Sequence, residues 1–220
     1  MISANRIIAK LHKDFLLATV IFVVAMVVYL SNGRMIESSD VVPASVLPVL
    51  NVREKTIYFD DMLSEVQYYI HGRNPYDYFL VKTRGHVVSW FPIVLPVVLI
   101  PLYFFYNLSL EIRNIPFSFY NFKYVESHIS FLKLSASLIA AFSGVSLYLI
   151  LKMIWKSSKV ALLTTFIYLF CASAWVINSQ ELWQHGLGNL LFFILIFLYL
   201  LTAVYGFSKS IFYTSSWGVR

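Results

Sequence analysis

The sequence predicts an all-α polytopic membrane protein, and three observations lead to that prediction. Of the 220 residues, 59% are hydrophobic and only 13% are charged, whereas soluble domains are about half apolar and a quarter charged. Several uncharged apolar runs are long enough to cross a bilayer as helices. The net charge of +6 is spread along the chain in short clusters, which suits the orientation of membrane helices and does not indicate nucleic-acid binding.

Four runs have the length and composition of transmembrane helices. They cover residues 14–31, 129–151, 160–178 and 187–206. The second run carries Ala136, Ala140 and Gly144 at four-residue spacing, a small face that favours close contact between membrane helices.

A fifth apolar run, residues 87–106, differs from the other four. It contains Pro92, Pro96 and Pro101, and each proline removes a backbone hydrogen-bond donor. The segment is therefore expected to be a kinked span or an interfacial or re-entrant helix.

Charge distinguishes four spans from five. Residues 1–13 contain three basic residues, so the N-terminus is expected in the cytoplasm. With four spans, the Lys-rich loop 152–159 and the tail 207–220 lie on the same side. With five spans, that short loop faces outward, against the positive-inside rule. We therefore expect four spans, with the N-terminus inside.

This topology leaves an external first loop over residues 32–128, far longer than typical connections. Its stretches "YFDDMLSEVQYYIHGRNPYDYFLV" and "IPFSFYNFKYV" are too aromatic for a disordered segment. We expect short juxtamembrane helices on the outer face, with their apolar sides in the lipid headgroup zone.

Individual residues near these segments have structural interpretations. Cys171 is the single cysteine; it excludes a disulfide framework and is expected to be a small packing residue. Lys133 lies near a span end, where its side chain can extend to the interface. Asp60 and Asp61 are expected to cap the helix that follows, the alternative being a divalent metal site that lacks a third ligand. No other cofactor is identified.

Three segments of the chain are notable: "SSDVVPASVLPVLNVREKTIYFDDM", "GHVVSWFPIVLPVVLIPLY" and "NSQELWQHGLGNLL". They resemble the N-terminal part of GT-C membrane glycosyltransferases, the class that includes protein mannosyltransferases and lipid A aminoarabinose transferases. The first is similar to the loop after the first span, which reads approximately G-D-T-x-P-A-R-Y-L-P in a prokaryotic branch. The second is similar to a segment S-x-Y-P-P-G that ends in P-L-Y, and the third is similar to L-W-Q-H-G-P. Their order and spacing also agree.

The resemblance has departures. Ser45 stands where the family has Arg, Ile93 and Val94 follow Pro92 where it has Pro-Gly, and Leu187 replaces a Pro. Family members have about twice as many spans, so the chain is expected to be an N-terminal fragment or a truncated homologue.

The resemblance implies an inverting transferase that moves a sugar from a polyprenyl-phosphate donor to an acceptor at the outer face of a prokaryotic cytoplasmic membrane. Asp40 occupies the position of the first-loop acid that acts as catalytic base or organises the acceptor. A carboxylate beside apolar groups and lipid is suited to accept a proton. The alternative is a solvated loop acid or a helix cap.

Basic and polar residues complete the candidate site. Arg73, Lys82 and Arg84 can stabilise the leaving phosphate, although bulk phospholipid is an alternative partner. Gln184 and His185 follow the third span and can bond a sugar or phosphate, or lie satisfied at the interface.

A second class of function is a non-catalytic, truncated membrane module that binds lipid-linked glycans or scaffolds a partner. Half of a transporter is a third reading, but charged residues are nearly absent from the spans, whereas an ion pathway usually needs them.

Overall fold

The computed structural model describes the backbone of residues 4–33, 35 and 38–215, and the side chains of residues 13–33, 35, 38 and 40–203. The chain is 75% helix and 4% strand, so the predicted helical class is confirmed. Four of the described helices are long and apolar enough to cross a membrane, over Lys13–Ser31, Val94–Ile112, Phe122–Trp155 and Gln184–Ala203. They differ from the four predicted spans, because the helix within 160–178 is shorter and the proline-containing segment forms a long apolar helix instead.

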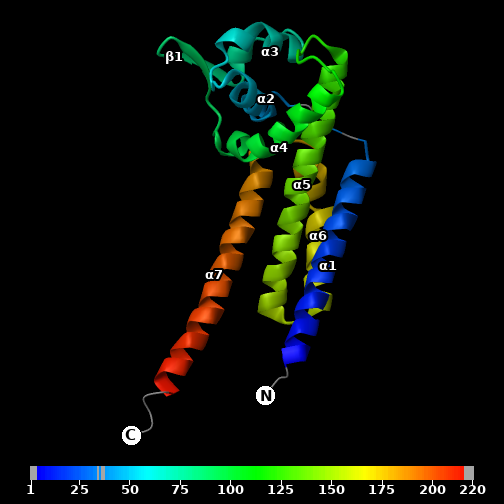
Figure 1. Ribbon diagram of the computed structural model, residues 1–220, viewed down its shortest axis with the longest axis vertical. Coiled ribbons are helices and arrows are strands. Elements are labelled where there is room, and N and C mark those ends of the chain that lie inside the picture. Colours follow the sequence, from blue (N-terminus) through cyan, green and yellow to red (C-terminus); the bar gives the residue numbers. More distant parts are fainter. Residues whose placement is uncertain (1–3, 34, 36–37, 216–220) are drawn as a thin grey trace.

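A lengthwise bundle carries a cap of shorter elements at one end (Figure 1). The helices of the bundle are α1 (Ala4–Ser31), α5 (Phe122–Trp155), α6 (Ser158–Cys171) and α7 (Gln184–Ser215). α5 is central, because it contacts α1, α6 and α7. The last described residues of α7 overlap the expected tail 207–220, of which residues 216–220 lie outside the described part.

Small residues allow α5 to lie close to its neighbours. Ala140 and Ala141 are buried against α1 and α6 in a small core with Ala25 and Leu169. A Cβ atom added to Gly144 would lie 2.4 Å from Cδ2 of Leu169. The expected close packing of this helix is therefore observed, with Leu169 of α6 over Gly144.

The third predicted span is shorter than expected. α6 ends at Cys171, Ala172 is extended (φ −126°, ψ −174°), and a π-helical turn, η5, covers Ala174–Asn178. The prediction of a continuous helix over 160–178 was therefore wrong in its second half. Cys171 is exposed on the outside of the bundle and is not the packing residue that was expected.

The cap is built from residues 38–112 and the connection to α5. Its elements are η1 (Ser39–Val41), α2 (Val42–Val49), η2 (Leu50–Glu54), η3 (Asp60–Met62), α3 (Leu63–Tyr69), η4 (Pro75–Asp77), β1 (Leu80–Thr83), β2 (His86–Ser89) and α4 (Val94–Ile112). The predicted long loop is thus folded around a hydrophobic core that it shares with α5 and the start of α7.

α2 explains the proline-punctuated run "VPASVLPV". All eight of its residues are buried, so an uninterrupted apolar run is what its position requires. Pro43 lies in the first turn, where no backbone donor is needed, and Pro48 lies near the end, before the π-helical turn η2 terminates at Lys55 (φ 53°). The expectation of a helix with one face in the headgroup zone does not describe α2, which is buried in protein.

α4 is the element that fits the expectation of a juxtamembrane helix with one apolar face in the headgroup zone. It lies across the end of the bundle instead of along it (Figure 1). Leu95, Leu99 and Tyr103 are buried in the cap, whereas Val97 and Phe104 are exposed. Because both faces are apolar, the exposed face is suited to lipid. α4 begins at Val94, so the predicted segment 87–106 was misplaced: residues 87–89 belong to a strand.

The cap contains a β-hairpin that the all-α prediction missed. β1 pairs antiparallel with β2, with Leu80 opposite Ser89 and Thr83 opposite His86. The two-residue turn is Arg84-Gly85, at φ 50° and 87°. Positive φ at both turn residues is typical of a type I′ hairpin turn, which glycine favours.

Asp60 attaches this hairpin to the start of α3. Its Oδ1 accepts a hydrogen bond from the Val87 N–H at 2.8 Å, and its Oδ2 lies 2.8 Å from Nδ1 of His86. The His86 contact, followed by the Val87 N–H, lowers the pKa of the Asp60 carboxyl. The prediction that Asp60 and Asp61 cap a helix was wrong, because neither η3 nor α3 has a side-chain cap.

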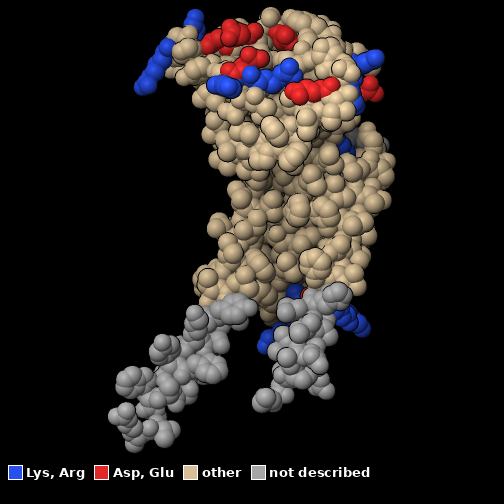
Figure 2. Space-filling view, viewed as in Figure 1, with Lys and Arg blue, Asp and Glu red and all other residues tan. Residues whose placement is uncertain are grey.

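Charged side chains lie at the two ends of the molecule and are nearly absent between them. Figure 2 shows acidic and basic side chains over the cap, basic side chains at the opposite end of the bundle, and an almost uncharged surface between them. That band is what a protein surrounded by lipid tails requires. The distribution supports an integral membrane protein.

Candidate functional site

A pocket of about 200 Å³ lies where the cap meets the bundle. It is formed by the segment before α2, the end of α3, the first half of α5 and the connection before α7. Apolar side chains such as Val41, Ile70 and Ile129 form much of its wall. Its polar lining residues are Ser38, Ser45, His71, Arg73 and Glu181.

Glu181 is the buried acid of this pocket. It is only 6% exposed, and its Oε1 accepts a hydrogen bond from the Ser38 N–H at 3.1 Å. Glu181 therefore holds the segment that leads into α2. Sequence analysis did not select this residue, although an acid directly after an apolar run was a usable signal.

A buried polar network lies next to the pocket. Lys133 is 8% exposed, and its Nζ donates to Gln180 Oε1 at 2.6 Å and to Asn32 Oδ1 at 3.1 Å. Gln180 Nε2 in turn donates to the Trp175 carbonyl oxygen at 3.0 Å. Lys133 thus joins α1, α5 and the connection before α7, and the prediction that it extends to the interface was wrong.

Asp40 lies at the rim of the pocket. Its neighbours Ser38 and Val41 line the pocket, while Asp40 is exposed and its N–H donates to Ser38 Oγ at 3.4 Å. Asp40 is therefore not buried among apolar groups of the protein, as had been expected for a raised proton affinity. Asp40 is not a helix cap either, because Val41 occupies the N-cap position of α2 and has no side-chain bond.

The predicted basic cluster is divided by the fold. Arg73 follows α3 and lines the pocket. Lys82 and Arg84 are exposed on the hairpin, which projects from the cap (Figure 1). Of the three predicted phosphate-binding residues, the structure brings only Arg73 into the pocket.

Gln184 and His185 form the beginning of α7. Gln184 is half-buried and His185 is exposed, and neither lines the pocket. Trp183, immediately before them, packs against the core of the cap. The pair therefore lies at the junction of cap and bundle, three residues beyond Glu181.

The three sequence segments singled out above meet in space. Val46 of the first segment, Leu99 of the second and Leu182 of the third belong to one hydrophobic core. The first and last of these residues, Val46 and Leu182, are more than 130 positions apart along the chain. The core fixes the pocket walls relative to one another, and the pocket combines these apolar walls with Arg73 and Glu181.

Among the described residues, no group of three or more His, Cys, Asp or Glu side chains is arranged to hold a metal ion. Comparisons with protein-family models, with curated proteins and with solved structures found no match for this chain.

Proposed function

We propose that this chain is the N-terminal part of an inverting membrane glycosyltransferase of the GT-C type, which uses a polyprenyl-phosphate-linked sugar at the outer membrane face. One observation carries the proposal: the three segments that resemble this class share one hydrophobic core, and the first and third of them line the pocket beside it. Such convergence is expected of a shared site.

In this proposal Asp40 is the base. The acceptor hydroxyl oxygen attacks the anomeric carbon, its proton passes to the Asp40 carboxylate, and the bond between that carbon and the phosphate oxygen breaks. The phosphate leaves with the bonding electron pair, and one displacement inverts the anomeric carbon. The exposed rim position of Asp40 leaves it accessible to an acceptor arriving from the aqueous side.

Arg73 and Glu181 have supporting roles. The Arg73 guanidinium at the pocket stabilises the negative charge that develops on the leaving phosphate. Glu181 is a positioning residue, because its bond to the Ser38 N–H holds the segment that contains Asp40.

A non-catalytic module that binds lipid-linked glycans is the second candidate. Among the described lining residues, Glu181 is the only acid, and it is engaged with the protein backbone. A pocket without a carboxylate free to act suits binding without turnover.

The substitution Asp40→Asn in the full-length protein tests the first proposal. Transfer of labelled sugar from a panel of polyprenyl-phosphate sugars is expected to fall about 10²- to 10⁴-fold, the usual contribution of a general base. Asp61→Asn, at another exposed acid of the cap, is the matched control. Unchanged transfer in Asp40→Asn removes Asp40 from the mechanism, and retention of donor without transfer by the wild type supports the binding module.

A further inference from the structure

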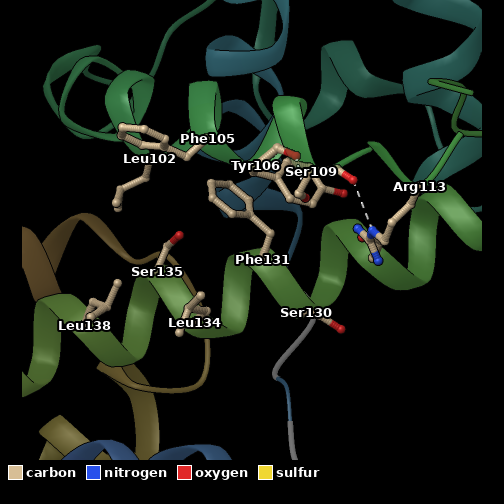
Figure 3. A pocket seen from close by; sticks show the side chains of 11 residues that line it. Leu102, Phe105, Tyr106, Ser109, Arg113, Ser130, Phe131, Leu134, Ser135 and Leu138 are labelled. Carbon is tan, nitrogen blue, oxygen red and sulfur yellow. Dashed lines mark hydrogen bonds between the residues drawn. The ribbon is translucent and has the colours of Figure 1, made fainter. Parts of the chain in front are cut away.

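A second, larger cavity lies between α4 and α5, on a different side of α5 from the pocket described above. It has a volume of about 400 Å³ and forms a groove (Figure 3). Leu102, Phe105 and Tyr106 of α4 form one wall, and Phe131, Leu134 and Leu138 of α5 form the other.

The open side of the groove is apolar, as a surface in contact with lipid would be. Phe105 is 67% exposed and Leu134 is 42% exposed, although both are apolar. The rings of Tyr106 and Phe131 stack with their centroids 4.5 Å apart, so α4 and α5 meet beneath the opening. A hydrocarbon chain from the surrounding bilayer can therefore enter sideways.

One end of the groove is cationic. Arg113, at the end of α4, donates from Nη2 to Ser127 Oγ at 2.7 Å and from Nε to the Ser109 carbonyl oxygen at 3.2 Å. These bonds use two of the five N–H groups of the guanidinium. The nearby Glu111 accepts a hydrogen bond from Asn107 Nδ2 at 2.8 Å.

Ser135 supplies an independent indication of a ligand. Its side chain is only 1% exposed, and among the described residues its Oγ has no hydrogen-bond partner. Figure 3 shows this hydroxyl directed from α5 toward the α4 wall of the groove. An unbonded buried hydroxyl is costly, so an acceptor oxygen inside the groove would stabilise it.

We infer that the groove binds one membrane glycerophospholipid. The phosphate lies at Arg113, an ester carbonyl oxygen accepts from Ser135, and an acyl chain occupies the space between the apolar walls. A single guanidinium matches the single charge of a phosphodiester. A polyprenyl phosphate has no ester carbonyl for Ser135. This inference is independent of the proposed glycosyltransferase activity.

Photolabelling in nanodiscs tests the inference. The full-length protein is reconstituted with phosphatidylglycerol that carries a diazirine on one acyl chain, and labelled peptides are mapped by mass spectrometry. Residues 102–105 and 131–138 are expected to be labelled several-fold more than the lipid-facing residues 192–199 of α7. Equal labelling of both regions would overturn the inference.

Substitutions separate the head and tail contacts. Arg113→Ala is expected to lower labelling of the groove about tenfold, because it removes a charge-assisted contact to phosphate, and Arg113→Lys is expected to restore part of it. Lys123→Ala, an exposed cation at the start of α5 outside the groove, is the control and leaves labelling unchanged. Equal losses in Arg113→Ala and Lys123→Ala would contradict a headgroup site. Ser135→Leu, which fills the groove, is also expected to lower labelling.

Competition identifies the occupant. Unlabelled phosphatidylglycerol is expected to displace the probe in proportion to its mole fraction, while inorganic phosphate has no effect. Stronger displacement by a polyprenyl phosphate at the same mole fraction would assign the groove to an isoprenoid lipid and overturn the inference, without bearing on the role of Asp40.

Discussion

Gly144 determines how closely α5 approaches α6. Because an added Cβ would lie 2.4 Å from Leu169, Gly144→Leu must displace the Leu169 side chain or push the two helices apart. Overpacking of this kind costs about 1–3 kcal/mol. We expect a lower thermal unfolding midpoint in detergent micelles for this variant.

The matched substitution is Gly188→Leu in α7, where a Cβ meets no atom within 4 Å. Leucine is also the better helix former by up to about 1 kcal/mol, so the midpoint is expected to stay the same or to rise. A similar loss in both variants would show that the tight contact at Gly144 is unimportant.

Single residues were the hardest part of the site to predict. Glu181 and Lys133 acquire their partners, Ser38 and Gln180, only through tertiary contacts across 143 and 47 positions. No local pattern encodes such distances. Asp60 was assigned to the nearest helix, whereas its partners His86 and Val87 lie on a hairpin 26 and 27 residues further along.

Tyr29 connects two helices of the bundle. It is fully buried in α1, and its hydroxyl donates to the Leu169 carbonyl oxygen at 2.9 Å. This carbonyl belongs to the last turn of α6, where helical carbonyls lose their usual partners. Tyr29→Phe is expected to cost about 1–3 kcal/mol, measured by unfolding in detergent.

The control for that substitution is Tyr199→Phe on α7, a tyrosine that is 70% exposed. It removes the same oxygen without leaving a buried carbonyl. If the two variants were equally stable, Tyr29 would not satisfy the end of α6.

The stability of the hairpin is expected to fall at acidic pH, because the Asp60 carboxylate helps to hold it. The folded pKa of Asp60 is lowered, so its stabilising contribution is complete above the ordinary carboxyl pKa of 3.8 and is lost as the pH falls through the lower folded value. Hydrogen exchange at the Val87 amide, corrected for intrinsic rate, is therefore expected to accelerate only in that acidic range.

Asp60→Asn removes the titrating group and should remove this dependence, while Asp61→Asn should retain it. An acid-dependent change that persists in Asp60→Asn would have another origin.

Hydrophobic length predicted the elements of the bundle better than those of the cap. The apolar runs identified α1, α5 and α7 because a span needs about 20 apolar residues. The end of α6 at Ala172 has no glycine or proline to announce it. The hairpin was missed because its strands have four residues each and its R-G turn is a weak signal beside the common N-G or D-G pairs.

The orientation of the whole molecule is a prediction that labelling can test. In a Cys171→Ser background, Thr83→Cys at the exposed hairpin is expected to react with a membrane-impermeant maleimide in intact cells. Lys159→Cys, at the opposite end, should react only after lysis. The reverse pattern would place the cap and its pocket in the cytoplasm and remove the geometry of the proposed transferase.

The class of the whole molecule could be predicted from the sequence, because the uncharged band shows in the composition. The arrangement of its helices could not be predicted in the same way. The composition of a chain depends on whether water or lipid surrounds it. A charged fraction of only 13% therefore indicated a protein surrounded by lipid. The transverse position of α4 depends instead on which of its apolar faces packs against α2 and the rest of the cap. Both faces look alike in the sequence.

The shortness of α6 affects how this part of the molecule meets the bilayer. Its 14 residues extend about 21 Å at 1.5 Å per residue, against a hydrocarbon thickness of about 30 Å. Leu163, Phe166 and Ile167 are exposed on this helix and meet lipid tails. The π-helical turn η5 continues this apolar surface beyond Cys171, because its Val176 and Ile177 are also exposed. Together the two elements offer lipid tails a longer apolar surface than the helix alone, which reduces the hydrophobic mismatch that so short a helix would otherwise cause.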